Sequence, residues 1–183
     1  MKVCCFLATG FEEVEALSVV DILRRGNIDT IMVSISGDLF VTGSHNITIK
    51  ADMKIEDVDF DSVDMLFLPG GMPGTTNLSG CKVLCDNIVD FNAKGKRLAA
   101  VCAAPSIFGD LGILNGKKAT CYPGFEERLV GATVVKDRVI TDGNITTSRG
   151  IGTSLELGLE LLKLLTNKES ADSMAQDIQH ICE

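Results

Sequence analysis

A cysteine at the end of an apolar run is the clearest sign of chemistry in this chain. Residues 98–101 predict a buried strand, Cys102 follows, and small residues lead to Pro105, which is tolerated in the first turn of a helix. Strand, sharp turn and helix form the nucleophile elbow of hydrolase folds. Unpaired backbone N–H groups, such as that of Ala103, and the positive end of the helix dipole would favour a thiolate. The alternative is a buried structural cysteine.

Acidic residues open the first predicted helix and could contribute a carboxyl group. A favourable interaction with the helix dipole is sufficient to explain why positions 12 and 13 are acidic (Glu12 and Glu13). Glu15 borders the apolar stripe of the helix and could point along the sheet edge toward a neighbouring strand end. Helical-wheel geometry does not select Glu15 over Glu12.

Two further segments could bind an anion. Gly70 and Gly71 follow an apolar run, where their N–H groups could form an oxyanion hole, although the segment by itself favours an ordinary glycine-rich turn. Arg149 precedes a long predicted helix, and an anion could lie on the N-terminus of that helix. Capping by Thr153 explains part of this pattern without a ligand.

Histidine and metal-binding patterns are weak. A cysteine hydrolase normally needs a histidine base, yet the only histidines are His45 and His180, and neither is a convincing partner for Cys102. Cys81 and Cys85 are spaced as half of a metal site without a matching second pair. We therefore expect no Cys–His–acid triad, no metal and no cofactor.

Strand and helix patterns alternate along the chain. This order predicts an α/β fold, a mostly parallel sheet with helices on both faces, whose ligands bind beyond the carboxyl ends of the strands. Strands are predicted at 2–8, 30–35, 63–68, 98–101, 118–121, 138–141 and 145–148, with an irregular hairpin at 38–50. Helices are predicted at 12–25, 81–94, 105–111, 153–165 and 168–180, with a weak helical piece at 125–130.

Composition narrows the function classes. The length of 183 residues fits a single domain, residues 1–183, and the net charge of -8 argues against nucleic acid as a partner. Apolar runs are too short for a membrane span, and no signal-peptide pattern follows the first strand, so a cytoplasmic protein is expected. The seven cysteines are an odd number without framework spacing, which indicates free thiols.

Taken together, the motifs resemble the ThiJ/PfpI superfamily, and within it the branch of Parkinson disease protein seven and its bacterial relatives. The resemblance rests on 10–15 (Gly-Phe-Glu-Glu-Val-Glu), 21–25 (Asp-Ile-Leu-Arg-Arg), 68–71 (Leu-Pro-Gly-Gly), 99–105 (Ala-Ala-Val-Cys-Ala-Ala-Pro) and 147–153 (Thr-Ser-Arg-Gly-Ile-Gly-Thr). It implies a flavodoxin-like three-layer sandwich and a homodimer.

The same resemblance implies roles for individual residues. Cys102 matches the nucleophilic, oxidation-sensitive cysteine, and Glu15 matches the protonated glutamate that hydrogen-bonds it. Gly70 and Gly71 match the backbone donors that face the site, and Arg25 matches a dimer-interface position.

Two positions depart from the family pattern. The site histidine of many relatives is replaced by Tyr122, and a serine–arginine pair of some relatives is Ser44-His45 here, near the dimer contact. The first change puts any histidine-assisted step in doubt, and the second alters a polar contact.

A neutral Glu15 donating to a Cys102 thiolate is the expected arrangement, because two adjacent negative charges resist joint ionisation. We therefore predict a strongly acidified Cys102 and a raised pKa for Glu15. This pair would support a glutathione-independent glyoxalase or protein deglycase, acting on reactive α-oxoaldehydes or glycated proteins. The alternatives are a redox sensor or chaperone based on oxidation of Cys102, and a non-catalytic dimeric scaffold.

Overall fold

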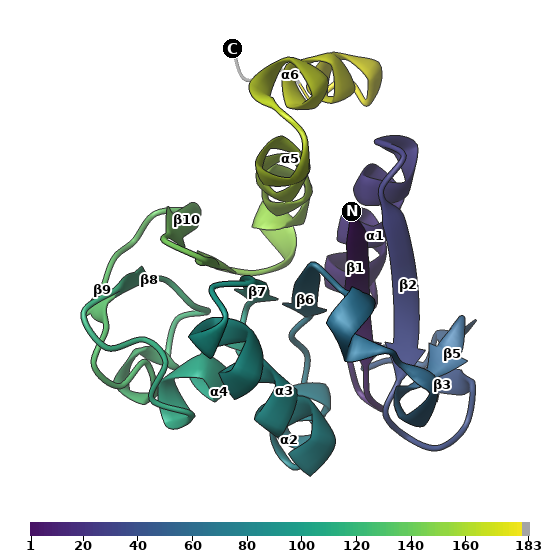
Figure 1. Cartoon of the computed structure of the whole chain (residues 1–183), viewed down its shortest axis with the longest axis vertical. Coiled ribbons are helices and arrows are strands. Elements are labelled where there is room, and N and C mark those ends of the chain that lie inside the picture. The colour runs from purple at the N-terminus through teal and green to yellow at the C-terminus, as the bar shows by residue number, and fades with distance from the viewer. Residues whose placement is uncertain (181–183) are drawn as a thin grey trace.

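A seven-stranded sheet forms the centre of the molecule in the computed structural model, which describes residues 1–180 (Figure 1). Its strand order is β10-β11-β7-β6-β1-β2-β5, and every neighbouring pair is parallel except β10 with β11. The strands are β1 (Lys2–Leu7), β2 (Asp29–Ser34), β5 (Met53–Lys54), β6 (Met65–Leu68), β7 (Arg97–Val101), β10 (Val139–Asp142) and β11 (Ile145–Ser148).

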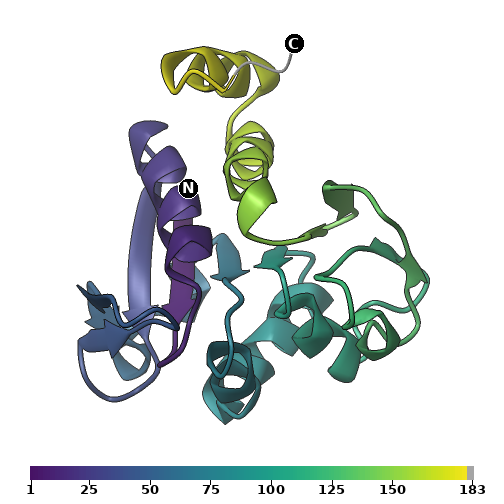
Figure 2. The ribbon, with the colours of Figure 1, turned by 180° about the vertical axis from the view of Figure 1, so that it is seen from behind.

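Helices cover both faces of this sheet, as Figures 1 and 2 show from opposite sides. The helices α1 (Glu13–Arg25) and α5 (Ser154–Leu165) pack on one face, with α6 (Lys168–Asp177) against α5. The other face carries α2 (Gly74–Ser79), α3 (Lys82–Ala93) and α4 (Pro105–Asp110). Within residues 1–180, no helix has the length and apolar character needed to cross a bilayer.

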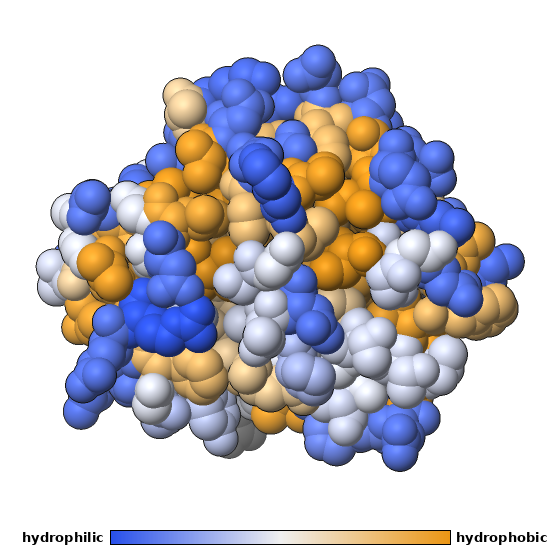
Figure 3. Space-filling view, turned by 90° about the horizontal axis from the view of Figure 1, so that it is seen from below, coloured by the Kyte–Doolittle hydropathy of each residue, from blue (hydrophilic) through white to orange (hydrophobic). Residues whose placement is uncertain are grey.

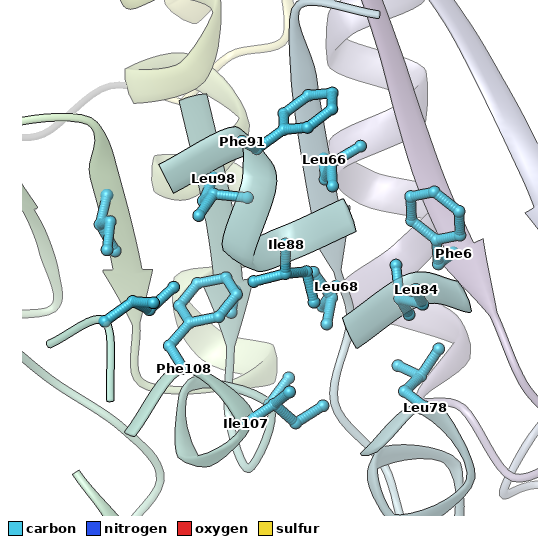
Figure 4. Packing of buried hydrophobic residues seen from close by; sticks show 14 of the residues in the cluster. Phe6, Leu66, Leu68, Leu78, Leu84, Ile88, Phe91, Leu98, Ile107 and Phe108 are labelled. Atoms are coloured by element: carbon cyan, nitrogen blue, oxygen red, sulfur yellow. The ribbon is translucent and has the colours of Figure 1, made fainter. Parts of the chain in front are cut away.

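Alternation along β1 divides the core into two clusters. Val3, Cys5 and Leu7 pack beneath α1 and α5, whereas Cys4 and Phe6 face the opposite layer, and all five side chains are fully buried. Figure 4 shows the second cluster, in which leucine, isoleucine and phenylalanine side chains of α2, α3 and α4 lie against β1, β6 and β7. Burial on both faces explains why these strands are continuously apolar.

Close packing fixes α1 on α5. A side chain at Gly158 of α5 would begin 2.7 Å from the Cδ1 atom of Ile22 on α1. Gly26, which ends α1, would similarly collide with Leu162. Because no Cβ intervenes, the two helices can approach closely, and α1 holds its residues in a defined orientation above the sheet.

The predicted architecture is confirmed, including the strands predicted at 138–141 and 145–148, which pair as the β10–β11 hairpin, and the irregular hairpin, which contains β3 (Phe40–Thr42) and β4 (Thr48–Lys50). The predicted strand at 118–121 is the shorter β8 (Lys118–Ala119), paired with β9 (Thr133–Val134). The strands β5 (Met53–Lys54) and β9 and the helix α2 have no clear signal in the sequence. The two strands have two residues each, and the Gly-Gly-Met-Pro-Gly segment before α2 predicts a turn. Short 3₁₀ turns occupy Ile55–Asp57, Phe60–Ser62, Glu126–Arg128 and Ile151–Thr153.

Candidate active site at the Cys102 elbow

Cys102 lies in a sharp turn between β7 and α4, as the sequence predicts. Its φ of 63° places it in the left-handed region, which is unfavourable for a residue with a side chain. The turn is held by the Cys102 N–H, which donates to the Ser148 carbonyl at 3.0 Å, and by the Tyr122 N–H, which donates to the Cys102 carbonyl at 2.8 Å. The side chain remains half-buried rather than enclosed.

Glu15 brings its carboxyl group to the sulfur from the first turn of α1. The side chain is 1% exposed, and its Oε2 accepts a hydrogen bond from the Gly70 N–H at 2.9 Å. A side-chain hydrogen bond also links Glu15 with Cys102. The structure thus selects Glu15 over Glu12, which helical-wheel geometry could not do.

Glycines after β6 allow this close arrangement. A Cβ on Gly70 would lie 2.5 Å from the Cys102 Cβ and 2.6 Å from Glu15 Oε2. Gly71 has a φ of 90°, and a Cβ there would meet the Glu12 backbone nitrogen at 2.3 Å. Both positions therefore require glycine for steric reasons, and Gly71 also for its backbone conformation.

The backbone donors differ in what they face. The N–H groups of Gly71 and Ala103 are directed at the Cys102 sulfur and favour its ionised form. The Gly70 N–H is instead directed at the Glu15 carboxylate. Of the three donors expected from the sequence, Gly70 therefore positions the acid rather than facing the sulfur.

The electrostatics of the pair contradict one expectation and confirm another. Burial, reinforced by the adjacent Glu15 carboxylate, raises the pKa of the Cys102 thiol to about 12 despite the two N–H donors. Burial likewise raises the pKa of Glu15 to about 7. The prediction of a strongly acidified Cys102 is thus wrong for the resting pair, because two backbone dipoles do not offset burial and a neighbouring negative charge. Above about pH 7 the pair retains one proton, which the thiol holds, and the thiolate forms when that proton moves to Glu15.

Tyr122 and Arg149 lie at the margin of the dyad. Together with Arg138 and the segment 150–153, they line a pocket of about 220 Å³. A Cβ on Gly150 would lie 3.3 Å from the Tyr122 ring and 3.8 Å from Glu15 Oε1, so this glycine separates the phenol from the acid. Figure 3 views the molecule from the end where β1, β6 and β7 finish, and apolar and near-neutral side chains cover much of that face.

His45 contacts the start of α1 rather than the cysteine. Its Nδ1 lies 3.0 Å from Glu13 Oε2 and 3.3 Å from Glu12 Oε2. Glu13 is 2% exposed, and its Oε1 also accepts the backbone N–H groups of His45 and Ile47. Interaction with the helix dipole therefore does not fully explain why an acidic residue occupies position 13, contrary to the sequence-based interpretation of Glu13. The sequence analysis missed this cluster because 32 residues separate its two halves.

Other predicted positions occupy different surroundings. Arg25 is exposed at the end of α1 and pairs with Asp21 of the same helix at 2.6 Å. The thiol of Cys85 donates to the Ser79 carbonyl at 3.3 Å, whereas Cys81 precedes α3. No histidine lies in the Cys102 site among residues 1–180, and the dyad there consists of a thiol and a carboxyl group.

Residues 1–164 match the sequence model of the DJ-1/PfpI family. The chain belongs to the DJ-1/PfpI family. Protein DJ-1 homolog B of Arabidopsis thaliana is 42% identical over 172 residues, which cover 93% of this chain and 39% of that protein. A Pyrococcus abyssi protein named a deglycase is 32% identical over 90% of this chain and 99% of its own length.

Solved DJ-1 structures confirm the fold and the DJ-1 branch. The structure of oxidized Toxoplasma gondii DJ-1 superposes with a TM-score of 0.93 at 33% identity, covering 97% of both chains. The chain spans about two fifths of the length of the Arabidopsis relatives, at 39% and 44%. These matches establish the family and the fold of the chain.

Proposed function

We propose that this chain is a cysteine-dependent, cofactor-independent enzyme that acts on reactive α-oxoaldehydes or on their adducts with proteins. The observation that carries this proposal is the hydrogen-bonded pair of Cys102 and Glu15 at the carboxyl end of the sheet. A sulfur nucleophile beside a base whose pKa is about 7 suits addition to an electrophilic carbonyl at neutral pH. The deglycase name of the Pyrococcus abyssi relative supports the same reaction class.

The first step uses Glu15 as a general base. Its carboxylate accepts the thiol proton while the Cys102 sulfur bonds to the aldehyde carbon, and the carbonyl electron pair moves onto oxygen. The N–H groups of Gly71 and Ala103 face the sulfur and can donate to this oxygen as its charge develops. Glu15 then passes its proton to the oxygen, which gives a hemithioacetal and restores the carboxylate.

The second step moves a proton between carbons. Glu15 removes the hydrogen from the former aldehyde carbon and returns it to the adjacent carbon, which converts the hemithioacetal into a thioester of a 2-hydroxy acid. Water then cleaves the thioester, which releases the hydroxy acid and the free thiol of Cys102. Together, the reaction steps are an internal redox isomerisation followed by hydrolysis, so no external oxidant or reductant is consumed.

Lactate formation from methylglyoxal without glutathione tests this proposal. The purified chain should produce lactate, and Cys102→Ser should abolish the product. Cys85→Ser is the matched control, because its thiol donates to the Ser79 carbonyl and lies outside the dyad. Equal turnover by wild type and Cys102→Ser would overturn the proposal. Release of lactate from methylglyoxal-treated peptide, with free aldehyde scavenged, would extend the activity to protein adducts.

Oxidation sensing by Cys102 is the second candidate. The half-exposed sulfur faces two backbone donors, and a protonated Glu15 could donate to an oxygen of a sulfinate. The oxidized Toxoplasma gondii relative favours this alternative. Whole-protein mass spectrometry after mild peroxide treatment should then show addition of two oxygens on Cys102, about 32 Da. Addition at Cys81 or Cys85 instead would contradict it.

We further propose that the chain forms a homodimer, with Arg25 and His45 at the interface that the family resemblance implies. Exposed apolar side chains near the start of α1, the hairpin and the start of α5 support self-association: Val14, Ile47, Ile151 and Leu155. Sedimentation velocity should give twice the mass of the chain, and Arg25→Glu should shift it toward the monomer. A wild-type monomer at micromolar concentration would contradict this proposal.

A further inference from the structure

A second cluster of ligand-type side chains lies where the first turn of α1 meets the β3–β4 hairpin. It contains two carboxylates, an imidazole and a hydroxyl, from Glu12, Glu13, His45 and Ser44. The proposed carbonyl chemistry uses none of these groups. The cluster is built from two segments about thirty residues apart, so the fold itself brings the four groups together.

The four ligand atoms form a compact group joined by short edges. His45 Nδ1 lies 3.0 Å from Glu13 Oε2 and 3.3 Å from Glu12 Oε2. Ser44 Oγ lies 3.1 Å from His45 Nδ1, 3.2 Å from Glu12 Oε2 and 3.4 Å from Glu13 Oε2. Five of the six edges therefore measure 3.0–3.4 Å. The centre of a regular tetrahedron with this edge lies about 2.0 Å from each corner, which matches zinc–nitrogen and zinc–oxygen bond lengths.

Charge in this cluster is not balanced by protein groups. The side chains of Glu12 and Glu13 are 13% and 3% exposed, and within residues 1–180 the only ion pairs of either are with His45. Two carboxylates thus share one imidazole, which leaves a net negative charge even when His45 is protonated. A buried negative pair of this kind favours a proton or a divalent cation at its centre.

The orientation of Glu13 is fixed before any ion arrives. Its Oε1 accepts the His45 N–H at 2.8 Å and the Ile47 N–H at 3.3 Å, which directs Oε2 toward the imidazole. The His45 side chain is 67% exposed in the single chain. Such supporting hydrogen bonds hold the ligands of metal centres in place.

We propose that Glu12, Glu13 and His45, assisted by the Ser44 hydroxyl, bind a divalent transition metal, with Zn²⁺ as the best match. One imidazole nitrogen with carboxylate oxygens suits zinc and similar ions, whereas calcium and magnesium prefer oxygen ligands alone. The ion replaces the proton shared by His45 and the carboxylates, so binding releases protons and weakens as the pH falls.

Titration of the full chain with zinc chloride, in chelator-free buffer containing a phosphine reductant, tests this site. One ion should bind per chain. His45→Ala and Glu12→Gln should each weaken binding at least about tenfold, since each removes a ligand. His180→Ala is the matched control, because it removes the other histidine of the chain and should leave the affinity unchanged.

Cobalt identifies the ligand type at the same time. Co²⁺ bound at this cluster should give visible bands of a tetrahedral nitrogen–oxygen site without a thiolate charge-transfer band. Circular dichroism checks the fold of each variant. Glu12→Gln removes a carboxylate charge while it retains the size of the side chain. Undiminished affinity in both ligand variants, a thiolate band lost in Cys102→Ser, or no zinc binding below about 1 mM would each overturn the proposal.

Discussion

The backbone N–H of Gly70 reaches Glu15 Oε2 at 2.9 Å across 55 residues of chain. This bond fixes one oxygen of a buried carboxyl group, while Oε1 lies 3.8 Å from the position that a side chain at Gly150 would occupy. Since the α-carbon of Gly70 also lies against Cys102, one loop residue orients the acid and leaves room for the thiol.

Glu15→Gln should abolish the general base while it preserves the shape of the side chain. We expect methylglyoxal turnover to fall about 10²–10⁴-fold, the usual contribution of general base catalysis. The pKa of the Cys102 thiol should fall, because the Glu15 carboxylate contributes to raising it. The pH dependence of Cys102 alkylation measures this second effect. A thiol pKa that is unchanged or higher in Glu15→Gln would show that the carboxylate does not act on the sulfur.

Catalysis should increase with pH through the raised pKa of Glu15. The carboxylate is the active base, and its pKa is about 7, so kcat/KM should rise between pH 6 and pH 8 rather than near the ordinary value of 4.5. The effect on stability has the opposite sign. The folded chain binds this proton more tightly than the unfolded chain, so the contribution of Glu15 to stability decreases as pH rises from 4.5 to about 7.

The pH profile of kcat/KM measures the catalytic effect, and the pH dependence of Tm measures the effect on stability. A midpoint near 4.5 would assign the base role to a solvent-exposed carboxylate instead.

Gly70→Ala should disrupt the dyad directly. The added methyl group would begin 2.5 Å from the Cys102 Cβ and 2.6 Å from Glu15 Oε2. Because neighbouring segments must move, we expect a loss of about 1–3 kcal/mol in the free energy of unfolding, together with a large loss of turnover. Gly80→Ala is the control, since its nearest atoms would lie at 3.6 Å and its φ is -78°. Chemical denaturation measures both, and equal stability of the two variants would contradict the model of a crowded site.

The contact of His45 with Glu13 should stabilise the protein in a limited pH window. The pKa of His45 is raised chiefly by its hydrogen bond to Glu13, so that contribution is fully present below 6.5 and is lost as pH rises through the raised value. Burial favours the neutral form of Glu13, but hydrogen bonds from its own backbone N–H, from the His45 N–H and ring and from the Ile47 N–H outweigh it and hold the pKa of Glu13 below 4.5. The contribution of the Glu13 carboxylate to stability is therefore present above pH 4.5 and is lost as pH falls below that value.

The Tm difference between wild type and His45→Ala, measured with chelator, should consequently be largest between about pH 4.5 and 6.5. His180→Ala serves as the reference variant. A difference that is constant from pH 4 to pH 9 would indicate that the imidazole stabilises the hairpin through packing alone.

Sequence patterns were sufficient for six of the seven strands of the central sheet, for the elbow and for the order of the main helices. The apolar strand before Cys102 and the proline after it specify the turn, because both are local properties of the chain. The choice of Glu15 over Glu12 required the family resemblance, since helical periodicity leaves both near the same edge. The direction of the Gly70 N–H, the pKa of Cys102 and the contact of Glu13 with His45 depend on burial and on distant segments. Spacing along the chain does not encode them.

The fully buried Cys4 and Cys5 on β1 have a practical consequence for handling the protein. Folding removes both sulfurs from oxidants, and burial keeps the pKa of each well above the ordinary value, so they are inert in the native state. Thermal denaturation would expose the two thiols side by side in an extended chain, and their pKa values would return to the ordinary value. Recovery of native protein after heating should therefore depend on a reductant, and samples aged in air should lose refolding yield before they lose secondary structure.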